Sequence, residues 1–216
     1  MDAKYTMTKD QGVFLANRNM AEYIYNSAKI EGCNITFAET QMILKGENVG
    51  HLDLHDIQRL LNLKTSWNYM LASFGYEFNL DYVCRVNMHV FRDEYFEGGE
   101  LRTKLTKPLP GTNYVPPIPV KEEIEAELTR LLGLENITHG AIKMFLWIYK
   151  AHLFMDGNRR TGFICANRRL IETGKGILTV KDIHSKEFNQ RLARHCETDD
   201  TSMEEWLYDT CLVGLN

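Results

Sequence analysis

Apolar residues recur three and four positions apart along most of the chain, which is the spacing of one buried face of an α-helix. An early example is the set Met20, Tyr23 and Ile24, which predicts a helix near the N-terminus. Further helices are predicted over residues 56–74, 80–95, 121–132, 141–151, 161–171 and 186–215. The alternation of apolar and polar residues that is typical of strands is scarce. The fold class is therefore predicted to be mainly α.

One segment, residues 96–119, breaks this helical pattern. It contains all five prolines of the chain together with Gly98, Gly99 and Gly111, and these residue types stop helices and form turns. A segment of this length without helix inside a compact domain is usually a lid or a binding loop rather than a connector. We expect residues 101–105 and 112–115 to pair as a short hairpin, and an ordinary connector is the alternative.

Length and composition narrow the range of functions. The 216 residues are 44% hydrophobic and show no repeat, low-complexity run or linker, so a single globular domain over 1–216 is expected. The formal net charge of -4 gives no bulk attraction to nucleic acid or to an anionic membrane, and neither is expected as a partner. The first ten residues do not resemble a signal peptide, and no window is long and apolar enough to span a bilayer. A cytoplasmic location is therefore expected.

A polar run at residues 156–160 separates two apolar helical segments. A turn at Gly157, followed by the free backbone N–H groups of a new helix, forms a site that attracts anions. Arg159 and Arg160 would lie in the first turn of that helix, where positive charge opposes the helix dipole, whereas a bound phosphate would satisfy both. The run therefore indicates a phosphate-binding site.

Two nearby side chains have the chemistry of phosphate-transfer enzymes. Asp156 comes directly before the turn, and its carboxylate suits Mg²⁺, which prefers one or two carboxylates together with phosphate oxygens and water. His152 lies four residues earlier, and the ordinary pKa of imidazole suits general-base chemistry near neutral pH. The alternative for either residue alone is a helix end with a solvated turn and a packed histidine. Their joint occurrence favours a catalytic site.

The run 152–160 resembles the Fic motif, His-Pro-Phe-x-Asp/Glu-Gly-Asn-Gly/Lys-Arg-x-x-Arg. The positions that match at the motif's spacing are His152, Phe154, Asp156, Gly157, Asn158 and Arg160. Members of this family usually transfer AMP from ATP to a hydroxyl group of a target protein. The resemblance extends roughly over residues 20–210 and implies a Fic-type helical fold with a short β-hairpin flap at about 98–117.

The resemblance implies a role for each matching residue. His152 would take the proton from the target hydroxyl, and Asp156 would hold Mg²⁺ against the α and β phosphates of ATP. Gly157 and Asn158 would form an anion hole, and Arg160 would stabilise phosphate charge as it develops during transfer. The implied cofactors are ATP and Mg²⁺, and the implied partner is a target protein with a Ser, Thr or Tyr hydroxyl. A homo-oligomer is left open.

The turn-rich segment is similar to the flap of the family, a hairpin that covers the nucleotide site and docks the target by pairing strand edges. The resemblance there lies in Gly99, Arg102 and the pair Pro116-Pro117. Residues Thr112, Asn113 and Tyr114 are expected to take part in target docking.

A second motif, Ser27-Ala28-Lys29-Ile30-Glu31-Gly32, fits the inhibitory motif of the family, Ser/Thr-x-x-x-Glu-Gly/Asn. The resemblance implies that residues 1–50 form an N-terminal region whose helix lies against the helical core of residues 51–216. Its glutamate would pair with an arginine that otherwise binds the γ-phosphate, so that ATP is held in an unproductive pose. Without the family, Ser27 and Glu31 are a polar and a charged residue near a helix end, with Gly32 just beyond it.

Three positions depart from the motif. Leu153 replaces proline at a helix end, Arg159 replaces glycine or lysine, and Phe163 replaces the final arginine. Because the final arginine normally binds the γ-phosphate and receives the inhibitory glutamate, Glu31 must pair with Arg160 or Arg159, stay solvated, or have no inhibitory role. Phe154 is expected to anchor the loop in the core.

These departures keep three functions open. The first is Mg²⁺-dependent AMP transfer to protein, restrained by the N-terminal helix. The second is phosphoryl transfer to protein, because a large cation at position 159 resembles the lysine-bearing branch of the family, which includes the toxin Doc. The third is a domain that binds nucleotide or protein without turnover.

Overall fold

The computed structural model of the chain describes residues 3–92 and 98–215. Its α-helices are α1 (Lys9–Arg18), α2 (Met20–Ile30), α3 (Phe37–Lys45), α4 (Leu54–Ala72), α5 (Leu80–Val90), α6 (Lys121–Leu132), α7 (Ile137–Ala151), α8 (Asn158–Glu172), α9 (Ser185–Thr198) and α10 (Ser202–Trp206). A 3₁₀ turn covers Asp182–His184 and a π-helical turn covers Leu207–Cys211. Two short strands, β1 (Ile177–Leu178) and β2 (Leu212–Val213), pair in antiparallel orientation. No helix in these described ranges has both the length and the apolar character needed to cross a membrane.

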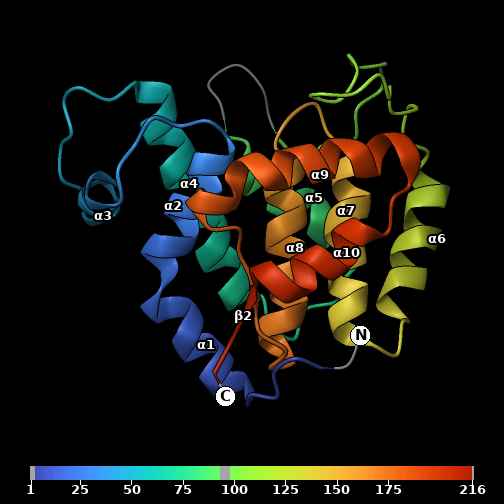
Figure 1. Ribbon diagram of the computed structural model, residues 1–216, viewed down its shortest axis with the longest axis horizontal. Coiled ribbons are helices and arrows are strands. Elements are labelled where there is room, and N and C mark those ends of the chain that lie inside the picture. Colours follow the sequence, from blue (N-terminus) through green and yellow to red (C-terminus); the bar gives the residue numbers. More distant parts are fainter. Residues whose placement is uncertain (1–2, 93–97, 216) are drawn as a thin grey trace.

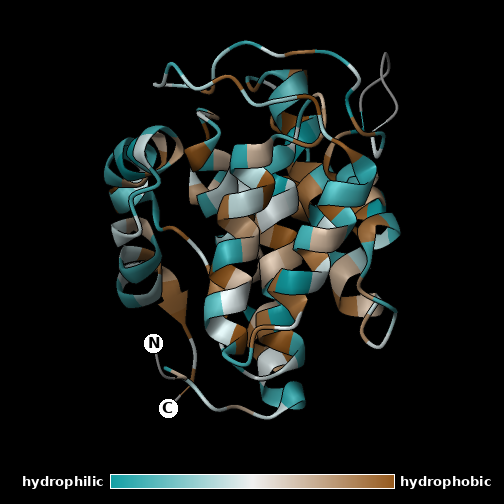
Figure 2. Ribbon diagram, turned by 90° about the vertical axis from the view of Figure 1, so that its right-hand side faces the viewer, coloured by the Kyte–Doolittle hydropathy of each residue, from teal (hydrophilic) through white to brown (hydrophobic). Residues whose placement is uncertain are grey.

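Helices α7 and α8 run side by side through the middle of the fold, and the other helices surround them (Figure 1). The apolar spacing of α7 turns Ile142, Met144 and Phe145 into the core, where none of them is exposed. The outer helices carry both hydrophobic and hydrophilic residues (Figure 2), as expected of helices with one face in the core and one in solvent. The pair α7 and α8 is therefore the scaffold that holds the loop between them.

Although many of its residues are polar, α8 is buried along nearly its whole length. The Asn167 amide accepts from the N–H of Leu178 at 2.7 Å and donates to its carbonyl at 2.9 Å. The guanidinium carbon of Arg168 lies 4.0 Å from the centre of the Tyr82 ring. Because buried polar groups with such partners fix orientation as well as position, these contacts hold α8 in one orientation in the core.

Helices α1 to α4 form a layer along one side of the central pair (Figure 1). Ile24 of α2 and Leu60 of α4 belong to a separate hydrophobic cluster of this layer, while Ala16 of α1 belongs to the main core. The C-terminal end of α2 thereby reaches the start of α8. The division of one domain into residues 1–50 and 51–216 stays a prediction.

The predicted mainly α fold class is confirmed. The predicted helix 121–132 has the bounds of α6, and α4, α7 and α8 begin and end within four residues of their predicted bounds. The helix predicted over 80–95 ends at Val90, and residues 93–95 lie outside the described ranges. The helices predicted over 186–215 include α9 and α10, which are separated at Asp199, whose backbone is left-handed, and the segment ends in β2.

Residues 98–120 form an irregular loop, and the pairing predicted between 101–105 and 112–115 is not formed. The Leu109 N–H donates to the Tyr114 carbonyl at 2.9 Å, which closes a turn near the middle of the segment. Backbone donors of both predicted strands bond elsewhere, since the Arg102 N–H donates to the Leu153 carbonyl at 2.9 Å and the Asn113 N–H donates to Oε1 of Glu197 at 2.6 Å. The antiparallel pair within the described residues is β1 with β2, elsewhere in the fold.

Candidate active site

The loop between α7 and α8 carries the candidate active site, and two residues with left-handed backbone shape it. His152 ends α7 with a φ of 49°, and Gly157 precedes α8 with a φ of 75°. A Cβ atom at position 157 would lie 2.9 Å from Cγ1 of Val90, so backbone and space both favour glycine. The predicted turn between two helices is confirmed. The first N–H groups of α8 have no acceptor within their own helix and point at this turn.

Asn158 closes the loop from inside. Its side-chain oxygen accepts from the N–H of Phe154 at 2.9 Å, and its amide donates to the Phe154 carbonyl at 2.8 Å. The Phe154 side chain is 1% exposed and lies in the main core, as expected of an anchor. Because both ends of the Asn158 side chain are occupied, the contribution of this residue to an anion hole would come from its backbone N–H.

Asn87 of α5 is a site residue that the sequence interpretation missed. Its amide donates to the Asp156 carbonyl at 2.9 Å and to Oγ1 of Thr161 at 3.1 Å, and its oxygen accepts from the N–H of Gly99 at 2.8 Å. One buried side chain therefore joins the loop, α8 and the start of the flap segment. The available signal was a polar residue among the apolar positions of α5, between Val86 and Val90.

The His152 ring is half-buried at the loop. Its Nδ1 atom is buried and has no hydrogen-bond partner among the described residues, while its carbonyl accepts from Nε of Arg102 at 2.5 Å. Burial, together with the positive charge of Arg102, lowers the pKa of His152 below the ordinary value of 6.5, and Asp156 opposes this shift. The ring is therefore neutral at pH 7, which is the form that accepts a proton.

Asp156 and Arg160 lie on the wall of a cavity of about 670 Å³ that also reaches α4. The Asp156 side chain is 56% exposed, and its Oδ1 lies 3.4 Å from Nη2 of Arg160. Arg160 is buried and also donates to the Val90 carbonyl at 3.2 Å. The volume is in the range of small-molecule sites. One carboxylate beside a phosphate-binding helix end is a donor set that fits Mg²⁺ bound together with a nucleotide.

Glu31 reaches the same loop from α2 and pairs with Arg159. The carboxylate accepts from Nε of Arg159 at 2.7 Å, and the same guanidinium donates to the Ile30 carbonyl at 3.1 Å and to Oδ1 of Asn189 at 2.9 Å. Gly32 follows with a φ of 83°, which ends α2 at this point. Of the partners left open by the sequence, the structure thus selects Arg159.

The charge balance around Glu31 favours its ionised form. Burial alone would raise the pKa of this carboxyl group, but the guanidinium groups of Arg159 and Arg160 outweigh burial and hold the pKa below its ordinary value. Ser27 lies one turn earlier on α2, where it borders a small cavity shared with Arg160 and Phe163. The segment 27–32 therefore lies against the start of α8, which it contacts through the Glu31 carboxylate.

Phe163, which stands where the Fic motif has its final arginine, packs against other aromatic side chains. Its ring centre lies 4.2 Å from that of Phe145 and 6.0 Å from that of Phe188. Ile30 of α2 belongs to the same hydrophobic cluster. Position 163 thus supports the packing of α2 and α9 on α8 and offers no charge to a phosphate.

Replacing Phe163 with alanine is expected to lower the free energy of unfolding by about 3–5 kcal/mol, because a buried ring is lost and leaves a cavity. Chemical denaturation monitored by circular dichroism measures this change. The matched control is Phe14→Ala, since that ring is 59% exposed and its loss should change stability by no more than about 0.5 kcal/mol. Equal effects of the two substitutions would contradict the packing role of Phe163.

Arg102, predicted to serve the flap, is buried and holds the flap segment against the end of α7. Its side chain is 2% exposed and donates to the carbonyls of His152, Lys104, Pro116 and Pro117. A single guanidinium therefore ties both halves of the flap segment to the end of α7. Burial lowers the pKa of Arg102, but hydrogen bonds to several carbonyls keep such a group satisfied.

Among the other predicted flap residues, Thr112 and Asn113 lie at the turn of the segment and Gly99 lies at its start. The Asn113 N–H donates to Oε1 of Glu197 at 2.6 Å, and Thr112 bonds the Leu109 carbonyl at 2.9 Å. Gly99 has a φ of 93°, and a Cβ atom there would lie 2.8 Å from the Cys84 carbonyl oxygen. The predicted docking role of these residues is not tested by this geometry.

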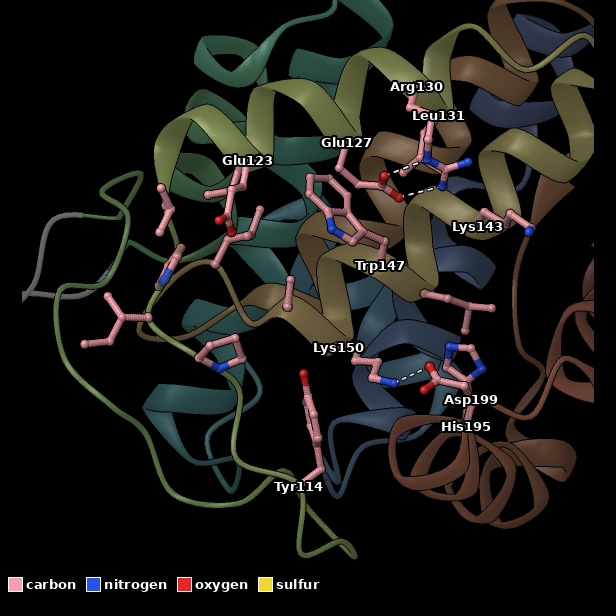
Figure 3. A pocket seen from close by; sticks show the side chains of 18 of the residues that line it. Tyr114, Glu123, Glu127, Arg130, Leu131, Lys143, Trp147, Lys150, His195 and Asp199 are labelled. Carbon is pink, nitrogen blue, oxygen red and sulfur yellow. Dashed lines mark hydrogen bonds and ion pairs between the residues drawn. The ribbon is translucent and has the colours of Figure 1, made fainter.

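Tyr114 belongs to a different cavity, of about 520 Å³, behind the flap segment (Figure 3). Its side chain points toward the end of Lys150, whose Nζ lies 5.1 Å from the ring centre and 2.5 Å from Oδ1 of Asp199. Trp147 of α7 forms part of the wall (Figure 3). The lining contains none of the charged or catalytic candidates of the loop, so we place the candidate chemistry in the cavity of Asp156 and Arg160.

Comparison with known proteins agrees with this geometry. Residues 77–170 match the sequence model of the Fic/DOC family, and this range contains Asn87 and the whole loop. No curated protein matches the chain. The fold is similar to that of a fragment of Fic-1 from C. elegans, with a TM-score of 0.72, 17% identity, and coverage of 89% of this chain and 60% of that one.

Two bacterial structures are also similar. One is a Fic domain containing signaling protein from Bacteroides thetaiotaomicron, with a TM-score of 0.65, 21% identity, and coverage of 82% of this chain and 71% of that one. The other is a Fic family protein from Desulfovibrio desulfuricans, with a TM-score of 0.68, 18% identity, and coverage of 91% and 64%. This chain thus spans about 60% of the length of the C. elegans fragment. Residues 77–170 thus match the Fic/DOC family in sequence, and the chain shares the fold of these Fic proteins.

Proposed function

We propose that this protein is a Mg²⁺-dependent adenylyltransferase that moves AMP from ATP to a Ser, Thr or Tyr hydroxyl of a target protein, under restraint by α2. The observation that carries the proposal is the loop at 152–160. A neutral imidazole, a carboxylate on a cavity wall and the N-terminus of a buried helix meet there within nine residues. The match of residues 77–170 to a family whose members are generally transferases supports the same class of reaction.

The residues divide the work of such a transfer. The attacking hydroxyl oxygen forms a bond to the α-phosphorus, and His152 accepts the proton that this oxygen loses. The bond from the α-phosphorus to the oxygen that bridges to the β-phosphate breaks, and pyrophosphate leaves. Arg160 and the first N–H groups of α8 stabilise the charge on the phosphate oxygens. Asp156 would hold Mg²⁺, which when bound neutralises charge on the leaving pyrophosphate.

Glu31 supports the proposed restraint, because its carboxylate occupies a guanidinium at the phosphate-binding turn. Arg159 donates to Glu31 at 2.7 Å and to the Ile30 carbonyl at 3.1 Å. An arriving phosphate would have to share or displace these contacts. α2 therefore lowers the population of protein that is ready to bind a triphosphate productively.

Labelling with ATP radiolabelled at the α or the γ position tests the proposal. The Glu31→Gly protein is incubated with Mg²⁺, ATP and a cell lysate, and protein-bound label is measured. Transfer of α label alone supports AMP transfer. The absence of α label from every protein, in wild type and variant, would refute it.

Phosphoryl transfer is a second candidate, and Arg159 favours it. A large cation takes the place of the glycine or lysine of the motif, directly beside the anion-binding turn, and Phe163 offers no charge. These changes alter how a triphosphate is held in the turn. Transfer of γ label alone would support this function. Nucleotide binding without transfer of either label would instead identify a domain that binds without turnover.

The proposed base predicts a pH dependence. Because burial and Arg102 lower the pKa of His152, the neutral form predominates already at pH 6.5. The rate constant kcat/KM should rise with pH as His152 loses its proton, with the midpoint of this limb below 6.5. Initial rates across about pH 4.5–8 measure the midpoint of the rate profile, and a nuclear magnetic resonance titration of the His152 ring measures its pKa for comparison. A midpoint above 6.5 that tracks the His152 resonance would contradict the burial of the base.

A further inference from the structure

We infer that Arg59 of α4 binds the terminal phosphate of the nucleoside triphosphate, so that α4 supplies the charge absent from position 163. This assignment rests on the proposed function to the extent that a nucleotide binds at the loop 156–160. It adds a residue that lies about a hundred positions before the motif and outside the segment of the family match.

Arg59 lines the same cavity as Asp156 and Arg160. The described lining also contains Arg92, so three guanidinium groups face one carboxylate across this space. An excess of positive charge on a cavity wall favours a ligand with several negative charges. A triphosphate carries such charge, and its inner phosphates would occupy the turn at Gly157 because that is where the helix N-terminus lies.

The two arginines at the start of α8 are less available than Arg59. The Arg159 guanidinium already donates to Glu31, Ile30 and Asn189. Arg160 is buried beneath the turn, where it bonds the Val90 carbonyl and contacts Asp156. Neither can reach outward to the end of a triphosphate without giving up contacts that hold the loop.

Arg59 is held in place, but its charge is only partly compensated. Its Nη1 donates to Oδ1 of Asp56 at 3.1 Å and to Sγ of Cys33 at 3.2 Å. A thiol is a weak acceptor, and burial raises the pKa of Cys33, so the thiol is neutral. The side chain is 18% exposed. A partly desolvated guanidinium with one carboxylate partner binds a phosphate more strongly than one in bulk water.

Arg59 is also coupled to the segment that restrains the site. Cys33, which contacts it, lies two residues after Glu31. Arg59 adds to the field of Arg159 and Arg160 that lowers the pKa of Glu31. The carboxylate of Glu31 therefore neutralises part of the charge that a terminal phosphate would meet, and removal of this carboxylate should strengthen binding of ATP more than of ADP.

The test compares the affinities of ATP and ADP, with Mg²⁺, in the full chain carrying Glu31→Gly. Calorimetry is used because it measures nucleotide binding even in a protein that transfers nothing. The added substitution Arg59→Gln, which keeps a donor for Asp56, should weaken ATP binding by about tenfold to hundredfold, the usual contribution of a charged hydrogen bond. ADP binding should change by less than about twofold. The matched control is Arg85→Gln, which removes an exposed arginine paired with Asp81 on α5 and should leave both affinities unchanged.

Several results would overturn the assignment. They are an unchanged ratio of ATP to ADP affinity in folded Arg59→Gln protein, equal weakening of both nucleotides, and the lack of any triphosphate binding before the substitution. Failure of the proposed function is separate, because a protein that binds ATP through Arg59 and transfers no AMP would sustain this inference and refute the other. Melting temperature and circular dichroism establish that the variants are folded.

Discussion

The Glu31→Gly variant is expected to transfer AMP to protein about 5- to 150-fold faster than the unmodified chain, which is the usual range of coupling between a regulatory contact and a site. The physical reason is the loss of the carboxylate that holds the Arg159 guanidinium at 2.7 Å. Without it, the positive charge at the start of α8 is free to meet phosphate. Incorporation of α-labelled ATP into protein over time measures the rate.

The controls for this experiment separate charge from local unfolding. Glu31→Gln keeps the size of the side chain and removes its charge, so it should reproduce most of the activation. Glu22→Gln removes a carboxylate from the first turn of the same helix and should leave the rate within about twofold. Activation by Glu22→Gln equal to that by Glu31→Gly would mean that loosening of α2, and not the contact with Arg159, releases the site.

Replacement of His152 by alanine in the Glu31→Gly protein is expected to lower the rate of AMP transfer by about 10²- to 10⁴-fold, the range that general-base catalysis contributes. The imidazole is neutral, half-buried and without a partner at Nδ1 among the described residues, so its removal takes away the base and little packing. Calorimetry with ATP should show that nucleotide affinity is kept, because the phosphate contacts lie at Gly157 and Arg160.

The matched control is His51→Ala, which removes an exposed histidine paired with Glu39 and should leave the rate unchanged. A His152→Ala protein that binds ATP and still transfers AMP at the parent rate would exclude His152 as the base. A protein that loses ATP binding as well would show that the ring supports the loop and would leave the rate loss without a chemical cause at position 152.

Much of the fold follows from local signals that are readable in the sequence. The period of apolar residues located α4, α6, α7 and α8, because one buried face is required of each helix in a packed core. The turn at Gly157 was equally local, since a glycine followed by a new helix start needs no distant partner. The prolines locate the flap segment, but its lack of strand pairing depends on distant contacts such as the bond from the Arg102 N–H to the Leu153 carbonyl.

Contacts between distant segments were beyond the sequence. Asn87 had no local signal that it would bond the Asp156 carbonyl, 69 positions away. Arg102 is predicted to serve the flap, whereas the fold places its guanidinium inside the protein, where it donates to five backbone carbonyls. Asn158 is predicted to form part of the anion hole, and because its side chain bonds the backbone of Phe154, its backbone N–H is the group left for that role.

Sequence patterns alone predict that this protein is built of helices and that an imidazole, a carboxylate and a glycine turn before a new helix lie close together at 152–160, because these features depend on neighbours within a few turns of helix. No local pattern indicates that Glu31 pairs with Arg159, 128 positions away, or that Arg59 shares a cavity with Asp156. Such pairings depend on how α2 and α4 pack on α8, and packing is a property of the whole core, to which every helix contributes.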